Sequence, residues 1–270
     1  MSSHTPWHSW LSQILGAARL WLAEWWRLFD LGALILVLAL SPSSYDRESR
    51  ALLSRHIYTS TAPILLGFSV LCALVTVVLT RIVMVTAQSY GLSSYALQLV
   101  IRVLVLELIP LTAALFVALR CTIPDGAELT VMQTSGALDE LRRQGVEPMR
   151  QEVLPRVVAG FLSGVTLAAL SCVVTLLVAY VAAYGFTISG VVAYTRLFGQ
   201  VFNPAVTLIF VMKTIFFSLA VSLIPMASAL YGIYELNGAN VRTSAEMRGL
   251  VRMFSIILLI EVASLVGNYY

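Results

Sequence analysis

From Val157 to Thr195 the chain reads VVAGFLSGVTLAALSCVVTLLVAYVAAYGFTISGVVAYT, which is 39 residues without Asp, Glu, Lys or Arg. About 20 apolar residues are enough for a helix to cross the hydrocarbon core of a bilayer. Shorter uncharged runs extend over residues 56–80 and 214–234. In the whole chain 59% of the residues are hydrophobic, only 11% are charged, and the mean hydropathy is +0.87. These values predict an all-α integral membrane protein.

The apolar runs predict about five transmembrane helices. We expect them at residues 60–85, 94–119, 156–184, 201–232 and 250–268. In a chain of 270 residues these helices leave little room for a soluble domain. We therefore expect an N-terminal interfacial or elbow-helix region at residues 1–55, followed by one transmembrane domain at residues 56–270.

The first 28 residues contain all five tryptophans, which recur with other apolar residues at steps of three and four. Arg19, Glu24 and Arg27 lie between them. This pattern is typical of an amphipathic helix that lies at the membrane surface with its indoles at headgroup level. The next apolar run, Leu31 to Leu40, is only ten residues long, so we expect it to be interfacial or re-entrant rather than spanning.

The basic residues predict the orientation of the chain in the membrane. A cytoplasmic N-terminus places 13 of the 17 basic residues on the inner side. The remaining four, which then lie outside or within the membrane, are Arg81, Arg102, Arg196 and Lys213. Because cytoplasmic loops are enriched in Lys and Arg, we expect the N-terminus inside and the C-terminus outside.

Several classes of function find little support in the sequence. Cys72, Cys121 and Cys172 are scattered in or beside apolar runs, which favours small buried hydrophobes over disulfides or metal ligands. The three histidines all precede the first convincing span, so none is available there as a base for a serine such as Ser163. Without a Gly-x-x-x-x-Gly-Lys-Ser/Thr loop, ATP would have to be bound by a separate chain. The basic residues are spread over short loops, so nucleic acid is not an expected partner.

Two charged residues lie deep within predicted spans and are candidates for function. Glu107 and Lys213 are each flanked by apolar residues on both sides, and charge at such depth is costly. They could handle a ligand, or they could simply neutralise each other. The charged residues nearer predicted span ends, which we expect to snorkel, are Arg81, Arg102, Arg196 and Glu261.

Residues 125–156 form the only sizeable polar segment of the second half of the chain. Apolar residues punctuate its charges, and Gly145 with Pro148 is typical of a helix stop. We expect a short amphipathic helix on the cytoplasmic side. It could be a connector that lies on the headgroups or a docking surface for a cytoplasmic partner.

Several short motifs occur in an order typical of one known family. They are Leu106-Glu107-Leu108-Ile109-Pro110, Ala127-Glu128, the run LDELRRQGVEP from Leu138 to Pro148, Pro155-Arg156, and Lys213. On these residues the chain resembles the MlaE (YrbE) family, the permease subunits of bacterial ABC-type MCE lipid transporters, over about residues 50–265. The chain departs from the family pattern at Leu106, at residues 119–124 and at Gly136.

The resemblance implies a homodimeric permease in the bacterial inner membrane, with a lipid-binding cavity between its two copies. The cavity would open to the periplasm beneath a hexameric MCE protein. The implied cavity residues are Leu79, Tyr90, Glu107, Leu108 and Lys213. A cytoplasmic ABC ATPase would bind ATP and Mg, and a STAS-domain protein would bind the ATPase. The implied coupling residues are Asp139, Glu140, Arg142, Arg143 and Glu147.

The sequence therefore favours a non-enzymatic permease subunit that moves phospholipid, powered by a partner ATPase and with no cofactor of its own. The alternative is a membrane scaffold or assembly subunit whose buried charges only form structural pairs. An intramembrane lipid-modifying enzyme is disfavoured because no base is available.

Overall fold

The computed structural model describes residues 23, 25–41, 47–91, 93–231 and 241–269. The predicted tryptophan-rich helix lies mostly outside these residues. Within them five helices are long and apolar enough to cross a membrane, and no residue is in a β-strand. The five helices are Leu53–Ser89, Tyr95–Thr134, Met149–Tyr184, Pro204–Tyr231 and Met247–Asn268. The prediction of an all-α membrane protein with about five spans is confirmed.

The elements follow one another as α2 (Arg47–Ser89), α3 (Ser93–Ile101), η2 (Arg102–Leu108), α4 (Ile109–Val117), η3 (Ala118–Thr122), α5 (Ile123–Thr134), α6 (Ala137–Arg143), η4 (Met149–Val153), α7 (Leu154–Tyr184), η5 (Ile188–Gly190), α8 (Val191–Val201), α9 (Pro204–Tyr231) and α10 (Val241–Tyr269). The second span is one continuous helix from α3 to α5 and ends at Thr134. Our expected boundary at residue 119 was too early, because a helix does not need apolar residues once it leaves the bilayer.

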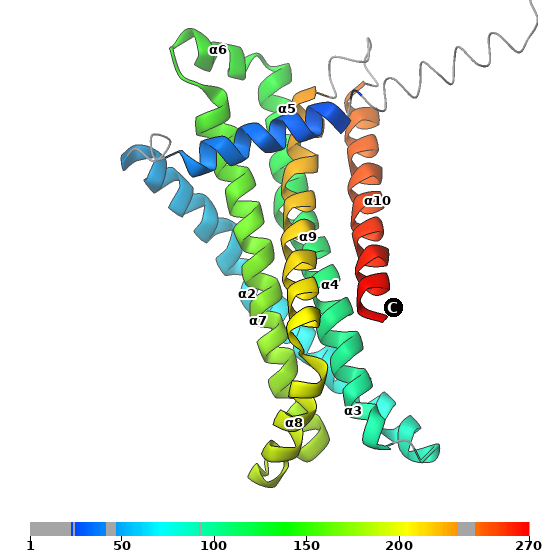
Figure 1. The fold of residues 1–270 in the computed structure, drawn as a ribbon. Helices are drawn as coiled ribbons and strands as arrows, with labels where there is room; N and C mark the ends of the chain where they lie inside the picture. The colour runs from blue at the N-terminus through cyan, green and yellow to red at the C-terminus, as the bar shows by residue number, and fades with distance from the viewer. Residues whose placement is uncertain (1–22, 24, 42–46, 92, 232–240, 270) are drawn as a thin grey trace, which may run out of the picture.

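The bundle has two distinct ends, which Figure 1 shows at top and bottom. One end, called here the α6 end, carries α6 and the end of α5. The other, called the α8 end, carries α8 and the turn between α2 and α3. α7 packs against α2 on one side and α9 on the other, and α9 packs against α10. α10 ends well short of the α8 end.

A helix over residues 25–40 lies across the bundle near the α6 end (Figure 1). Leu28, Leu31 and Ile35 are buried against the spans, while Trp26 and Leu40 are exposed. A helix with apolar residues on both its inner and its outer side suits the membrane interface. The interfacial alternative for Leu31 to Leu40 therefore fits the structure better than a re-entrant segment.

Three π-helical turns interrupt the second and third spans, and each ends two residues before a proline. η2 precedes Pro110, η3 precedes Pro124 and η4 precedes Pro155. Proline has no N–H to donate, and its ring collides with the carbonyl of the preceding turn. A wider turn relieves that collision, and such turns often occur at functional sites.

Small residues on α7 allow its close approach to α9. A Cβ atom added to Gly164 would lie 2.6 Å from the Oγ of Ser218, and one added to Gly160 would lie 3.3 Å from the Cβ of Ser222. On the α2 side, the hydroxyl of Ser163 forms a 2.6 Å hydrogen bond with that of Thr61. Small residues and short hydroxyls are the usual means of helix packing in membranes. Gly160 and Gly164 thus let α7 approach α9 closely, and Ser163 links α7 to α2.

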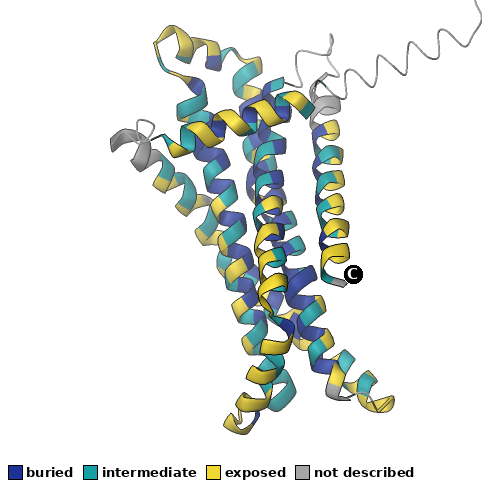
Figure 2. Ribbon diagram, in the orientation of Figure 1, coloured by how far each residue is buried: buried dark blue, intermediate teal, exposed yellow. Residues whose placement is uncertain are grey.

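The outward faces of α2 and α10 are largely exposed and apolar (Figure 2). Examples are Leu66 and Leu74 on α2, and Leu258 and Leu259 on α10. In a bilayer such residues contact lipid or another chain. Cys72, Cys121 and Cys172 are instead buried, as predicted.

At the α8 end, a cluster of tyrosines holds α8 against α7. The hydroxyl of Tyr194 on α8 donates a 2.8 Å hydrogen bond to the carbonyl of Leu176, and its ring packs edge-on against Tyr180. Burial, helped by the neighbouring Tyr184, raises the pKa of Tyr194 to about 12. The phenol therefore stays neutral and keeps its hydrogen bond at physiological pH.

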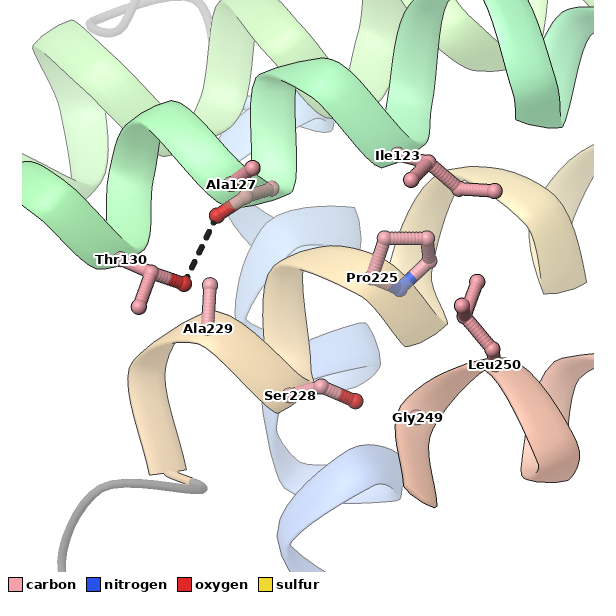
Figure 3. A pocket seen from close by; sticks show the side chains of 9 residues that line it. Ile123, Ala127, Thr130, Pro225, Ser228, Ala229, Gly249 and Leu250 are labelled. Atoms are coloured by element: carbon pink, nitrogen blue, oxygen red, sulfur yellow. Dashed lines mark hydrogen bonds between the residues drawn. The ribbon is translucent and has the colours of Figure 1, made fainter. Parts of the chain in front are cut away.

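At the α6 end, α5, α9 and α10 enclose a small apolar cavity of about 80 Å³ (Figure 3). It lies where Gly126 meets Pro225, because a Cβ atom on the glycine would be 3.2 Å from the proline. A drug-sized ligand needs a pocket of about 300 Å³ or more. This cavity is too small for a phospholipid and marks imperfect packing around Pro225.

Candidate functional site

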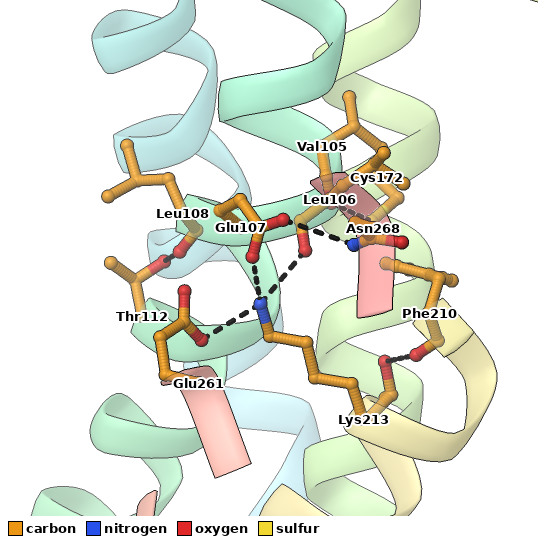
Figure 4. Close-up of polar contacts among 11 residues, drawn as sticks. Val105, Leu106, Glu107, Leu108, Thr112, Cys172, Phe210, Lys213, Glu261 and Asn268 are labelled. Carbon is orange, nitrogen blue, oxygen red and sulfur yellow. Dashed lines mark hydrogen bonds and ion pairs between the residues drawn. The ribbon is translucent and has the colours of Figure 1, made fainter. Parts of the chain in front are cut away.

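Four polar side chains from three helices meet in the interior of the bundle (Figure 4). Glu107 comes from η2, Lys213 from α9, and Glu261 and Asn268 from α10. The Nζ of Lys213 forms an ion pair and a hydrogen bond with Glu107, and it lies 2.8 Å from the Oε2 of Glu261. Asn268 donates from Nδ2 to the Oε1 of Glu107 at 3.2 Å. We call these four residues the charge cluster.

The charge cluster is enclosed by protein. The exposed fraction of the side chain is 1% for Lys213, 12% for Glu107 and 16% for Glu261. The ring of Phe217 lies 5.6 Å from the ammonium group. Two carboxylates and one ammonium leave a net charge of −1 when all three are ionised. Such a group is stable in the bundle only as long as every charge keeps its partner.

Pro110 explains why this part of the second span accepts a lysine. A residue with an N–H at position 110 would donate to the carbonyl four or five residues earlier, which is that of Leu106 or Val105. Proline cannot donate, so the carbonyl that would have accepted this bond needs another partner. Lys213 donates to the carbonyl of Leu106 at 3.2 Å, and the thiol of Cys172 lies 3.9 Å from that of Val105. The proline and its π-helical turn thus prepare an acceptor beside Glu107.

The sequence predicted two of the four members of the charge cluster. Glu107 and Lys213 were singled out, and the structure brings them into contact. Our expectation that Glu261 snorkels was wrong, because its carboxylate points inward to Lys213. Asn268 was missed. The available signal was spacing, since Glu261, Ser264 and Asn268 recur at steps of three and four and therefore share one face of α10.

The predicted coupling residues lie on and beside α6, at one end of the bundle. Leu138 is buried and fixes α6 to the core, while Asp139 and Arg142 are exposed and pair at 3.1 Å. The other predicted residues form further exposed pairs, namely Arg143 with Glu140 at 3.6 Å and Glu147 with Arg150 at 3.9 Å. The result is a short charged platform. Its helix spans only residues Ala137–Arg143, and the first part of the predicted polar segment, residues 125–134, belongs to α5 instead.

Two glycines shape the connections on either side of α6. Gly136 has φ 76° and Gly145 has φ 79°, a left-handed conformation that side chains with a Cβ rarely adopt. Gly136 immediately precedes α6. The tight turn between α5 and α6 favours a glycine at position 136, which explains why the chain departs from the family pattern there.

A buried arginine joins the base of this platform to the third span. The side chain of Arg156 on α7 is only 5% exposed; it pairs with Glu152 at 2.8 Å and with Glu128 on α5 at 3.5 Å. These pairs connect the motif Ala127-Glu128 to the motif Pro155-Arg156, which the sequence alone did not link. Arg156 on α7 thus links α5 and η4 to α7 beneath α6.

A family model described as Permease MlaE matches residues 53–266. The chain belongs to the MlaE permease family. A comparison with curated proteins finds no match to this chain. Family membership and five spans indicate a membrane permease component of lipid transport.

Among the other predicted cavity residues of this MlaE permease, Leu108 directly follows Glu107 of the charge cluster (Figure 4), whereas Leu79 and Tyr90 come from α2 and the turn after it, which contribute no member of the cluster. Leu79 on α2 and Leu108 on η2 are half-buried, and Tyr90 is exposed at the turn between α2 and α3. A cavity shared by two copies stays a prediction. The apolar cavity at Pro225 is not part of this site, because Pro225 lies 12 residues from Lys213 along α9, or about 18 Å.

Proposed function

We propose that this MlaE permease is the membrane subunit of an ABC-type transporter that moves phospholipid between the bacterial inner membrane and a periplasmic MCE protein. The family match over residues 53–266 carries the proposal. The charge cluster supports it, because charge buried in spans commonly marks a transport pathway.

In this proposal the α6 end faces the cytoplasm and the C-terminus faces the periplasm. The positive-inside rule supports that orientation, since 13 of the 17 basic residues then lie inside. The ATPase docks on the exposed charges of α6 and binds the ATP and Mg itself. Movement of the ATPase reaches the spans through the Arg156 pairs with Glu152 and Glu128, because these pairs join α5 to α7.

A second copy of the chain completes the lipid cavity. Leu79, Tyr90 and Leu108 would line its apolar walls, and the charge cluster would form its polar floor. A phospholipid needs an apolar trough and a few polar groups, which these residues can supply. The cavity opens toward the MCE hexamer on the periplasmic side, while a STAS-domain protein binds the ATPase.

The scaffold alternative has one observation in its favour. Every charge in the cluster already has a partner, as a purely structural cluster requires. Reconstitution of the complex in proteoliposomes decides between the two. A permease transfers fluorescent phospholipid to the MCE acceptor and shows lipid-stimulated ATP hydrolysis. A scaffold transfers none, and its partner hydrolyses ATP at the same rate with and without lipid.

A further inference from the structure

The α8 half of the molecule carries cations without any carboxylates to balance them. No Asp or Glu occurs in residues 57–106, 153–234 or 262–270, which supply every described element on the α8 side of the charge cluster. Three arginines lie in that half, namely Arg81, Arg102 and Arg196. An anion that reaches this region therefore meets only positive side chains until it reaches Glu107 and Glu261.

Arg102 differs from the other two arginines in its surroundings. Arg81 and Arg196 are exposed, whereas Arg102 is half-buried in η2. Its Nε is shielded from solvent and has no hydrogen-bond partner among the described residues. A buried donor of a charged group is costly to leave unpaired. Arg102 thus presents a partly enclosed guanidinium whose Nε has no acceptor within the described part of the chain.

The position of Arg102 along the second span is also defined. It lies nine residues after α3 begins at Ser93, or about 13 Å into the helix, and five residues before Glu107. Leu99 and Val103, which flank it on the helix, are 55% and 46% exposed. α10 ends at the level of the cluster, where Asn268 contacts Glu107, well short of the α8 end (Figure 1).

Arg81 supplies an internal comparison. It lies eight residues before α2 ends at Ser89, so the two arginines lie at similar depth on opposite sides of the α2–α3 turn. An exposed arginine at this depth can snorkel to the headgroups of bulk lipid. The guanidinium of Arg102 is more enclosed by protein than that of Arg81, because its Nε is shielded from solvent.

We propose that Arg102 binds the phosphate of the transported phospholipid, an assignment that rests on the proposed function. Guanidinium pairs with phosphate through two parallel hydrogen bonds, which suits a headgroup of fixed orientation. Leu99 and Val103 provide apolar contacts beside it. The charge cluster holds two carboxylates and one ammonium that is already paired, so it offers no free donor to a phosphate that moves further along the span, and the headgroup stops at Arg102.

The test measures binding of trace fluorescent lipid to the complete transporter complex in maltoside detergent, which contains no phosphate. Phosphatidylethanolamine is compared with diacylglycerol, which has the same acyl chains but no phosphate. Arg102→Gln should weaken phosphatidylethanolamine binding about tenfold or more and leave diacylglycerol binding unchanged. Arg102→Lys should give an intermediate loss, because lysine keeps the charge but not the paired geometry. Arg81→Gln is the matched control and should bind both lipids as the wild type does.

Other outcomes overturn the assignment. Equal phosphatidylethanolamine binding by wild type and Arg102→Gln, or an equal loss of both lipids, would assign Arg102 a structural role. Displacement of bound lipid by millimolar inorganic phosphate would make free phosphate the ligand. If the wild-type complex binds phospholipid through Arg102 but never transfers it, the proposed function is wrong while the assignment of the binding site stands.

Discussion

Replacing Lys213 with methionine removes the only cation of the charge cluster and keeps the length of the side chain. Glu107 and Glu261 then lie close together with 12% and 16% of their side chains exposed, too little for water to replace the ammonium. Removal of one partner from a buried ion pair costs about 3–5 kcal/mol. For a chain of this length each kcal/mol lowers the unfolding midpoint by about 2–4 °C. We expect Lys213→Met to lower it by about 6–20 °C.

A neutral version of the cluster separates stability from function. The triple variant Glu107→Gln, Lys213→Met, Glu261→Gln has no unpaired charge, and Gln at position 107 can still accept from Asn268. Well-packed neutral replacements of buried ion pairs are often tolerated. We expect the triple variant to recover most of the unfolding midpoint. Lipid transfer should stay low in both variants, because the polar floor of the cavity is gone.

The assay combines scanning fluorimetry in detergent with lipid transfer by the reconstituted complex. Thr214→Val is the control, because this neighbouring residue bonds only to its own helix, at the carbonyl of Phe210. An unchanged midpoint in Lys213→Met would refute the electrostatic argument. Normal transfer by the triple variant would show that the cluster is only structural and would remove it from the lipid site.

Three further predictions concern the platform, the helix packing and the orientation. Exchanging Asp139 and Arg142 (D139R, R142D) should release the ATPase at an unchanged unfolding midpoint, since exposed pairs contribute at most about 1 kcal/mol; full ATPase retention in a pull-down would contradict the coupling role. Gly164→Val should destabilise the bundle by about 1–3 kcal/mol, because its Cβ would lie 2.6 Å from a facing hydroxyl; an unchanged midpoint would argue against close packing. Of two exposed positions, Tyr90→Cys should react with an impermeant thiol reagent only from the periplasm and Gln144→Cys only from the cytoplasm, and the reverse would overturn the orientation.

The spans could be predicted because a span requires only a long apolar run, which is visible in a single stretch of sequence. An uncharged run as long as residues 157–195 is expected to contain a membrane-spanning helix whatever its neighbours are, and here that helix is α7, which ends at Tyr184. Glu107 and Lys213 stood out for the same reason, since each interrupts a run of that kind. Glu261 did not, because a glutamate close to the C-terminus reads equally well as a snorkelling residue. Its inward orientation depends on α9 packing beside α10, which no single segment encodes.

Pro110 links a feature of the local sequence to a contact between two helices, the one between Lys213 and the turn that precedes the proline. A proline inside a span leaves carbonyls of the preceding turn without a donor, and in a bilayer no water replaces it. The carbonyls nearest to the missing donor are those of Leu106 and Val105. The Leu106 carbonyl accepts from Lys213 on α9, and the Val105 carbonyl accepts from the thiol of Cys172 on α7. Glu107 follows Leu106 directly, so the same turn that frees a carbonyl also presents the carboxylate. The Leu106 carbonyl and the Glu107 carboxylate are therefore neighbouring acceptors on one turn, and Lys213 on α9 contacts both of them.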